Sequence, residues 1–130
     1  MNDVNKETNV NLELEKGLSA LRQSEILFNN QEYDGSVSRA YYAIFHFAQA
    51  ILFSKGLEAK THQGVNRLFN LHFVRTGFFE KKYSTILSHA QKAREESDYS
   101  PEVPFNKEDA SIRIEEAKTF FNKAQTFLNT

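Results

Sequence analysis

The chain has 130 residues, about the length of one domain and enough to bury one hydrophobic core, so two domains are not expected. With 40% hydrophobic and 25% charged residues, its composition is that of a globular protein and argues against intrinsic disorder. A formal net charge of -1 argues against a protein that coats nucleic acid through bulk charge, and the absence of cysteine excludes disulfides, thiolate metal sites and cysteine nucleophiles.

Hydrophobic residues recur with the period of a helix along nearly the whole chain. We expect a disordered tail over residues 1–10 and a first helix over about residues 11–30, followed by a short turn over residues 31–35. A second helix is predicted over about residues 36–55, because Gly56 suits the left-handed position that commonly ends a helix.

Three more helices are predicted in the second half of the chain. Thr61 can cap the start of a third helix, and a fourth covers about residues 79–97. Two prolines then end the fourth helix, and Asn106 can cap the last one. The buried side of the last helix is predicted to carry Ile114, Ala117, Phe121, Ala124 and Leu128. No strand pattern, repeat or linker is found, so residues 11–130 are predicted to form one all-α domain, an up-and-down antiparallel bundle of four to five helices.

Arg39 and His46 share one face of the second predicted helix. They lie seven residues apart, so at about 100° per residue their directions differ by only about 20°. The opposite face carries the apolar residues expected to enter the core, whereas the face near the two polar groups carries alanines and is low in relief. Such a face could admit another helix or a ligand, and a cation beside an imidazole could bind a phosphate.

Arg94 interrupts the apolar side of the fourth helix, in line with Leu87 and Ala90. A partly buried guanidinium needs a partner, and Asp98 lies one turn further along. We favour an internal ion pair that fixes helix order over a catalytic role for this pair. Tyr99, which follows, is interpreted first as a packing residue with a hydrogen-bonded hydroxyl.

The remaining histidines suggest one secondary site. His62 lies near the start of the third helix, where backbone amides can hold an anion, so Thr61, His62 and Tyr42 are candidates for phosphate or nucleotide binding. His72 and His89 are predicted to be surface or core residues. No pair has the His-x-x-x-His spacing with a third ligand, so neither a metal site nor a cofactor is predicted.

Neither export nor membrane insertion is predicted. Residues 1–10 lack the basic and then apolar pattern of a signal peptide. The longest apolar run, residues 40–53, is interrupted by His46 and Gln49 and is shorter than the roughly 20 residues of a membrane span. With the absence of cysteine, these features predict a cytoplasmic protein without membrane contact.

Three segments carry a more specific pattern: SRAYYAIFH at residues 38–46, GLEAKTHQGV at 56–65 and REESDYSP at 94–101. In this order they resemble a HEPN domain of the small stand-alone bacterial and archaeal kind, and the resemblance covers about residues 11–128. It implies a helical bundle that dimerises and is commonly encoded beside a minimal nucleotidyltransferase. Many members of the family resemble toxins of toxin–antitoxin pairs and act as metal-independent ribonucleases.

The resemblance also implies where an active site should lie. The active HEPN signature is an arginine, four to six further residues and then a histidine, on the helix that here carries Arg94. This sequence departs from it, because Tyr99 stands five residues after Arg94 and is preceded by Asp98. Arg39 and His46 satisfy the same spacing, with six residues between them, but on an earlier helix.

Two functions from different classes follow. The first is a homodimeric, toxin-like endoribonuclease in which His46 moves protons and Arg39 stabilises phosphate charge, with Arg94, Asp98 and Tyr99 as secondary candidates. The alternative is a non-catalytic HEPN module that binds a nucleotidyltransferase partner, RNA or a nucleotide, which the missing histidine after Arg94 favours. Family analogy adds a third possibility, that the nucleotidyltransferase, as antitoxin, modifies Tyr99 or a neighbouring hydroxyl and thereby silences the protein.

Overall fold

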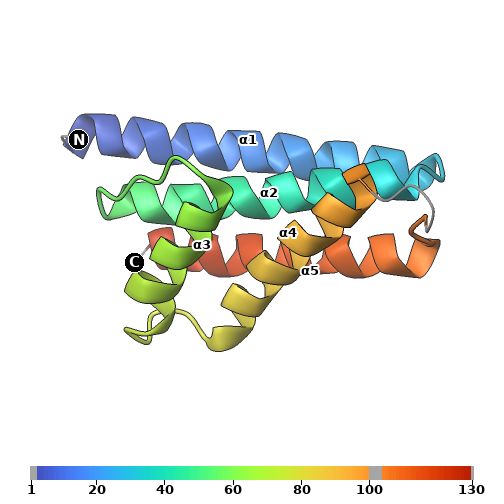
Figure 1. Ribbon diagram of the computed structural model, residues 1–130. Coiled ribbons are helices and arrows are strands. Elements are labelled where there is room, and N and C mark those ends of the chain that lie inside the picture. The colour runs from blue at the N-terminus through green and yellow to red at the C-terminus, as the bar shows by residue number, and fades with distance from the viewer. Residues whose placement is uncertain (1–2, 100–103, 130) are drawn as a thin grey trace.

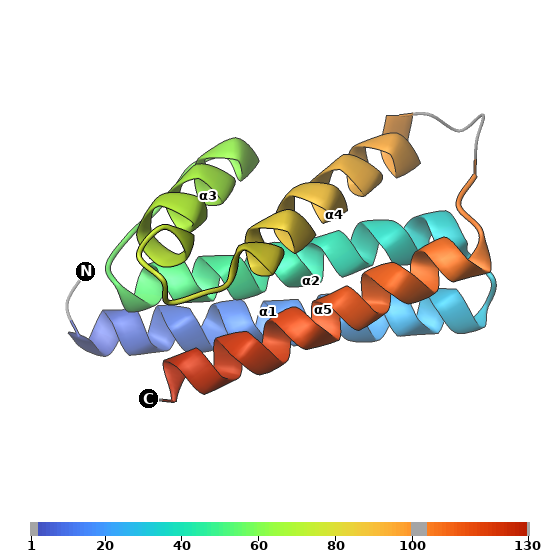
Figure 2. The same ribbon diagram turned by 90° about the horizontal axis from the view of Figure 1, so that it is seen from below.

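The computed structural model describes residues 3–99 and 104–129, except for the side chains of residues 3, 4 and 99. The chain folds into helices in the order α1 (Asp3–Asn29), α2 (Tyr33–Ser54), α3 (His62–Phe69), the short π-helix η1 (Asn70–Val74), α4 (Lys81–Tyr99) and α5 (Lys107–Leu128). Helices α1, α2 and α5 lie alongside one another, and α3 and α4 cross α2 on one side (Figures 1 and 2). The prediction of an all-α antiparallel bundle is confirmed.

The first helix is longer than the sequence predicted. It begins at Asp3, so residues 3–10 are helical, whereas a disordered tail was expected there. Val10 lines a pocket with Leu14, together with Ser54 at the end of α2 and Leu128 at the end of α5. The start of α1 thus lies beside the ends of two other helices, and tertiary neighbours of this kind stabilise helical structure that the local sequence alone does not.

Helix α2 is the centre of the bundle, because both its faces are buried. The apolar side predicted from the sequence is covered, and the low-relief side that contains Ala43 and Ala50 is covered as well. Helix α1 packs on this second side, and a Cβ atom added to Gly17 would lie 2.3 Å from the ring of Phe47. The absence of a side chain at Gly17 thus lets the two helices approach closely.

The core beyond α2 is aromatic. Phe69 from α3 packs against Phe79 and against Phe120 of α5, with ring centroids 5.1 and 5.5 Å apart. The sequence predicted Phe121 on the buried side of α5, but Phe120 is the fully buried residue and Phe121 is half-buried. Phe121 instead packs against Phe47 of α2, at 5.0 Å. Because α5 contacts two surfaces, both neighbouring rings find partners.

None of the described helices combines the length and the apolar character that crossing a membrane would need.

Candidate functional site

Arg39 and His46 both face the seam between α1 and α2. Nδ1 of His46 lies 2.6 Å from Oε2 of Glu13, and Nη1 of Arg39 donates a hydrogen bond of 3.2 Å to Oε1 of Gln23. The Arg39 guanidinium also lies 4.6 Å from the ring centroid of Tyr42. The two residues that share a face in the sequence are therefore held by side chains of a different helix.

The register of this seam is set at its turn end. Ser24 and Ser36 are both fully buried, and the hydroxyl of Ser24 donates to the Ser36 carbonyl at 2.6 Å while the Ser36 hydroxyl donates to the Ser24 carbonyl at 2.8 Å. Since α1 and α2 run antiparallel, this pairing places earlier residues of α1 beside later residues of α2 (Figure 1). Glu13 consequently reaches His46.

The seam opens into a solvent-facing pocket of about 250 Å³, the α1–α2 pocket. Its lining residues are Lys16, Ser19, Ala20, Gln23, Arg39, Tyr42 and His46. Lys16 and Arg39 supply two positive charges, and His46 supplies a group that can exchange a proton. The pocket thus combines the groups that bind and activate a phosphodiester.

Arg94 reaches the same region from α4. Its guanidinium lies 5.5 Å from the ring centroid of Tyr41 and 5.9 Å from that of Tyr42, and Nη1 donates to Oδ2 of Asp98 at 3.3 Å. The ion pair with Asp98 is therefore present, as predicted. Burial acts to lower the pKa of Arg94, but Tyr42 and Asp98 together raise it, so the guanidinium remains charged. Its Nε is buried without a hydrogen-bond partner among the described residues.

His62 completes the group from the start of α3. Its ring stacks on Phe45, with centroids 4.5 Å apart and planes at 23°, and its Nδ1 is hydrogen-bonded to the Tyr41 hydroxyl. Burial, followed by the positive charge of Arg94, lowers the pKa of His62. Burial also raises the pKa of Tyr41, so its hydroxyl stays protonated and donates the hydrogen bond to Nδ1 of His62.

Two further candidates for phosphate binding, Thr61 and Tyr42, and the secondary catalytic candidate Tyr99 have different surroundings. Thr61 acts as the N-cap of α3, as predicted, and its hydroxyl accepts a hydrogen bond of 2.9 Å from the Gly64 amide. Tyr42 is half-buried, lines the α1–α2 pocket and contacts both arginines. Tyr99 is the last residue of α4, and its side chain lies outside the described part of the structure.

Glu13 is a residue of this site that the sequence analysis did not single out. It is 8% exposed, and although burial acts to raise the pKa of its carboxyl group, the hydrogen bond and charge of His46 lower it below the ordinary value. Lys16 acts in the same direction. The available signal was Gly17, one turn further on the same face of α1, which marks a close approach of another helix.

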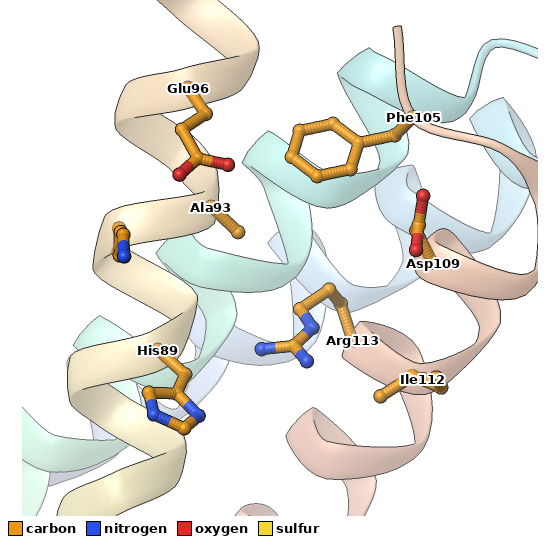
Figure 3. Close-up of a pocket in the computed structure, with 8 residues that line it drawn as sticks. His89, Ala93, Glu96, Phe105, Asp109, Ile112 and Arg113 are labelled. Atoms are coloured by element: carbon orange, nitrogen blue, oxygen red, sulfur yellow. The ribbon is translucent and has the colours of Figure 1, made fainter. Parts of the chain in front are cut away.

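A second pocket, of about 300 Å³, lies between α4 and α5 (Figure 3). Arg113 projects into it from α5 and pairs with Glu116, with Nη1 and Oε1 3.1 Å apart. His89 is one of its lining residues, and Glu96 and Asp109 bring acidic groups to the same walls. None of the candidate residues from the sequence lines this pocket. Its balanced charges suit a phosphate less well than the α1–α2 pocket.

Among the described residues, no group of three or more histidine, aspartate or glutamate side chains is placed to hold a metal ion.

Comparison with known proteins finds relatives that match most of the chain. The sequence model of the HEPN domain family matches residues 10–127. A protein of Methanocaldococcus jannaschii named "Putative toxin MJ0605" is 39% identical over 127 residues, which cover 97% of this chain and 92% of the relative. A second protein of that organism, "Putative toxin MJ0142", is 31% identical over 88% of this chain and 78% of its own length. A "UPF0332 protein" of Thermotoga maritima is 31% identical, over 83% and 82% respectively.

Proposed function

Because this chain belongs to the HEPN domain family, we propose that it is a toxin-like, metal-independent endoribonuclease whose site is the α1–α2 pocket. Support comes from relatives with toxin in their names and, above all, from one observation about the pocket. Arg39 and His46 line the same open pocket, with Lys16 beside them and Tyr42 linking them to Arg94. A phosphate bound there would meet cations and an imidazole together.

The chemistry needs only a base, an acid and a cation. His46 removes the proton from a ribose 2′-hydroxyl, and the 2′-oxygen attacks the adjacent phosphorus as the bond from phosphorus to the 5′-oxygen breaks. The leaving 5′-oxygen takes a proton from a second, protonated imidazole. Arg39 and Lys16 stabilise the negative charge that gathers on the non-bridging oxygens. The products carry a 2′,3′-cyclic phosphate and a 5′-hydroxyl.

The proposal includes a homodimer, because a symmetric pair presents His46 twice and can divide the acid and base roles between two copies. We expect sedimentation analysis to give twice the chain mass of 15.0 kDa. A protein that remains a monomer at the concentration of the cleavage assay would remove the dimer from the proposal.

RNA cleavage in EDTA tests the proposed activity. Purified wild-type protein and the variant His46→Ala are incubated with a mixed RNA substrate, and the ends of the products are analysed. His89→Ala is the matched control, because His89 is exposed on α4 and lines the other pocket. We expect wild type and control to produce cyclic phosphate ends and His46→Ala to lose about 10²-fold or more in rate. Full activity of His46→Ala would refute the assigned chemistry.

A second candidate is a non-catalytic HEPN module that binds a nucleotidyltransferase partner, RNA or a nucleotide. It is favoured by Arg94, which is paired with Asp98 and is followed at the family's histidine position by Tyr99. This candidate predicts no cleavage by any variant but measurable binding of a labelled RNA, or of a nucleotidyltransferase encoded beside the protein. Absence of all such binding would count against it.

A further inference from the structure

We infer that Glu13 is a positioning residue, which holds the His46 imidazole in a single tautomer and orientation for proton transfer at the α1–α2 pocket. This inference rests on the proposed function of the pocket. Glu13 comes from α1, is not among the residues that line the pocket, and contacts the imidazole of His46 with Oε2 2.6 Å from Nδ1.

The burial of Glu13 calls for an explanation. A carboxylate is almost never buried without a partner, because removal from water disfavours its charge. Its contact with Lys16 is long, at 3.5 Å, and the Lys16 side chain is 60% exposed, so that ion pair contributes little. The close partner is His46, whose side chain is 23% exposed. A buried pair of this kind is poor evidence for stability, since apolar residues of similar size could fill the same space.

The contact determines which imidazole nitrogen is free. An ionised carboxylate only accepts hydrogen bonds, so Nδ1 of His46 must carry the proton that Glu13 binds. In the neutral imidazole, Nε2 is then the unprotonated nitrogen and can accept a proton from a substrate hydroxyl. After that transfer, the carboxylate stabilises the imidazolium, in the same way that a buried aspartate serves the histidine of a serine protease.

The charges around His46 show what the carboxylate of Glu13 contributes. Lys16 of α1 and Arg39 of α2 line the pocket with His46, and His62 of α3 lies close enough to interact with its charge. All three are basic groups, whereas Glu13 brings a negative charge against the imidazole. The α4 residues that act on His62 are Arg94 and Glu95, which have opposite signs. Without Glu13, an imidazolium at position 46 would face mainly positive neighbours.

Glu13→Gln tests the inference, because glutamine keeps the size of the side chain but loses the charge and brings an amide N–H group that can donate to an unprotonated Nδ1. Glu15→Gln is the control, since Glu15 is exposed on the same helix. We measure the ring nitrogen chemical shifts of His46 by NMR near pH 8, and kcat and KM for RNA cleavage. In wild type and in Glu15→Gln, we expect the tautomer protonated at Nδ1.

In Glu13→Gln, we expect a shift toward the tautomer protonated at Nε2 and a fall of about 10²-fold in kcat with KM nearly unchanged. Wild-type cleavage together with an unchanged tautomer and kcat in Glu13→Gln overturns the positioning role and leaves the proposed function standing. A wild type without activity overturns the proposed function, and with it the catalytic purpose of the contact. The NMR spectra then still decide whether Glu13 sets the tautomer.

Discussion

At the scale of single residues, Tyr42 connects two arginines that come from different helices. Its ring centroid lies 4.6 Å from the Arg39 guanidinium and 5.9 Å from that of Arg94. Each such contact contributes about 0.5–1 kcal/mol at a partly exposed site. Tyr42 therefore orders positive charge at the pocket, which long and flexible side chains would not do by themselves.

Replacement of the Tyr42 ring should weaken RNA binding. Because the cation–π contacts need an aromatic face but no hydroxyl, we expect Tyr42→Phe to bind a labelled RNA within about twofold of wild type. Tyr42→Leu should bind about 5-fold more weakly, as follows from a loss of about 1 kcal/mol. Fluorescence anisotropy measures both affinities, with His46→Ala as the common background to prevent cleavage. Equal affinities for the two variants would show that the ring does not order the arginines.

At the scale of elements, the seam between α1 and α2 places the site. Gly17 allows the close approach, and the buried serine pair Ser24 and Ser36 sets the register near the turn. The same approach brings Glu13 to His46. A change in the spacing of the two helices should thus affect both stability and the site.

Gly17→Ala should separate these helices. An alanine normally stabilises a helix by up to about 1 kcal/mol relative to glycine. Here, however, its Cβ would lie 2.3 Å from the fully buried Phe47 ring, so we expect a net loss of about 1–3 kcal/mol in the free energy of unfolding. Urea denaturation measures it, and Gly35→Ala is the control, because its Cβ meets the flexible end of Leu27 at 3.2 Å. A Gly17→Ala protein more stable than wild type would contradict this packing.

Local sequence signals predicted local features of the elements well. Thr61 caps α3, and Asn106 caps α5 in a reciprocal capping box with Asp109, because capping depends on residues within one turn. The helical period likewise predicted that Arg39 and His46 share a face. Predictions that depended on contacts between helices fared less well.

The features that the sequence did not reveal all involve a second element. Part of the first turns of α1, from Lys6 to Val10, lines a pocket with the C-terminal end of α5, and Phe120 and Phe121 contact different neighbours of α5. Glu13 is one of several acidic residues in the first half of α1, and only Gly17, one turn further on the same face, distinguishes it from exposed Glu15. Its role follows only from the register of α1 against α2.

At the scale of the whole molecule, two groups make the folded state sensitive to acid. The pKa of His62 is lowered from its ordinary value of 6.5, mainly by burial, so the unfolded chain binds this proton more readily than the folded one. The pKa of Glu13 is lowered from 4.5 through His46, against the effect of burial. Both contributions are complete at neutral pH. His62 loses its contribution as the pH falls below about 6.5, and Glu13 loses its own as the pH falls below about 4.5.

We therefore expect the midpoint temperature of thermal unfolding to decrease as the pH is lowered from about 7.5 to about 5.5. We expect His62→Gln to reduce this dependence on pH. Burial raises the pKa of Glu116, which acts in the opposite direction, so the informative quantity is the part of the slope that His62→Gln removes. His89→Gln, at an exposed position, should keep the wild-type slope. Identical slopes in all three proteins would show that His62 is not the acid-sensitive group.

The location of the RNA site is the central claim, and NMR with an uncleavable substrate tests it most directly. The isotope-labelled protein is titrated with an oligonucleotide that lacks the attacking 2′-hydroxyl. We predict that the perturbed signals belong to Lys16, Arg39, Tyr42 and His46, around the α1–α2 pocket. Perturbations confined to the pocket of His89 and Arg113, or none at all, would contradict the assignment of the site.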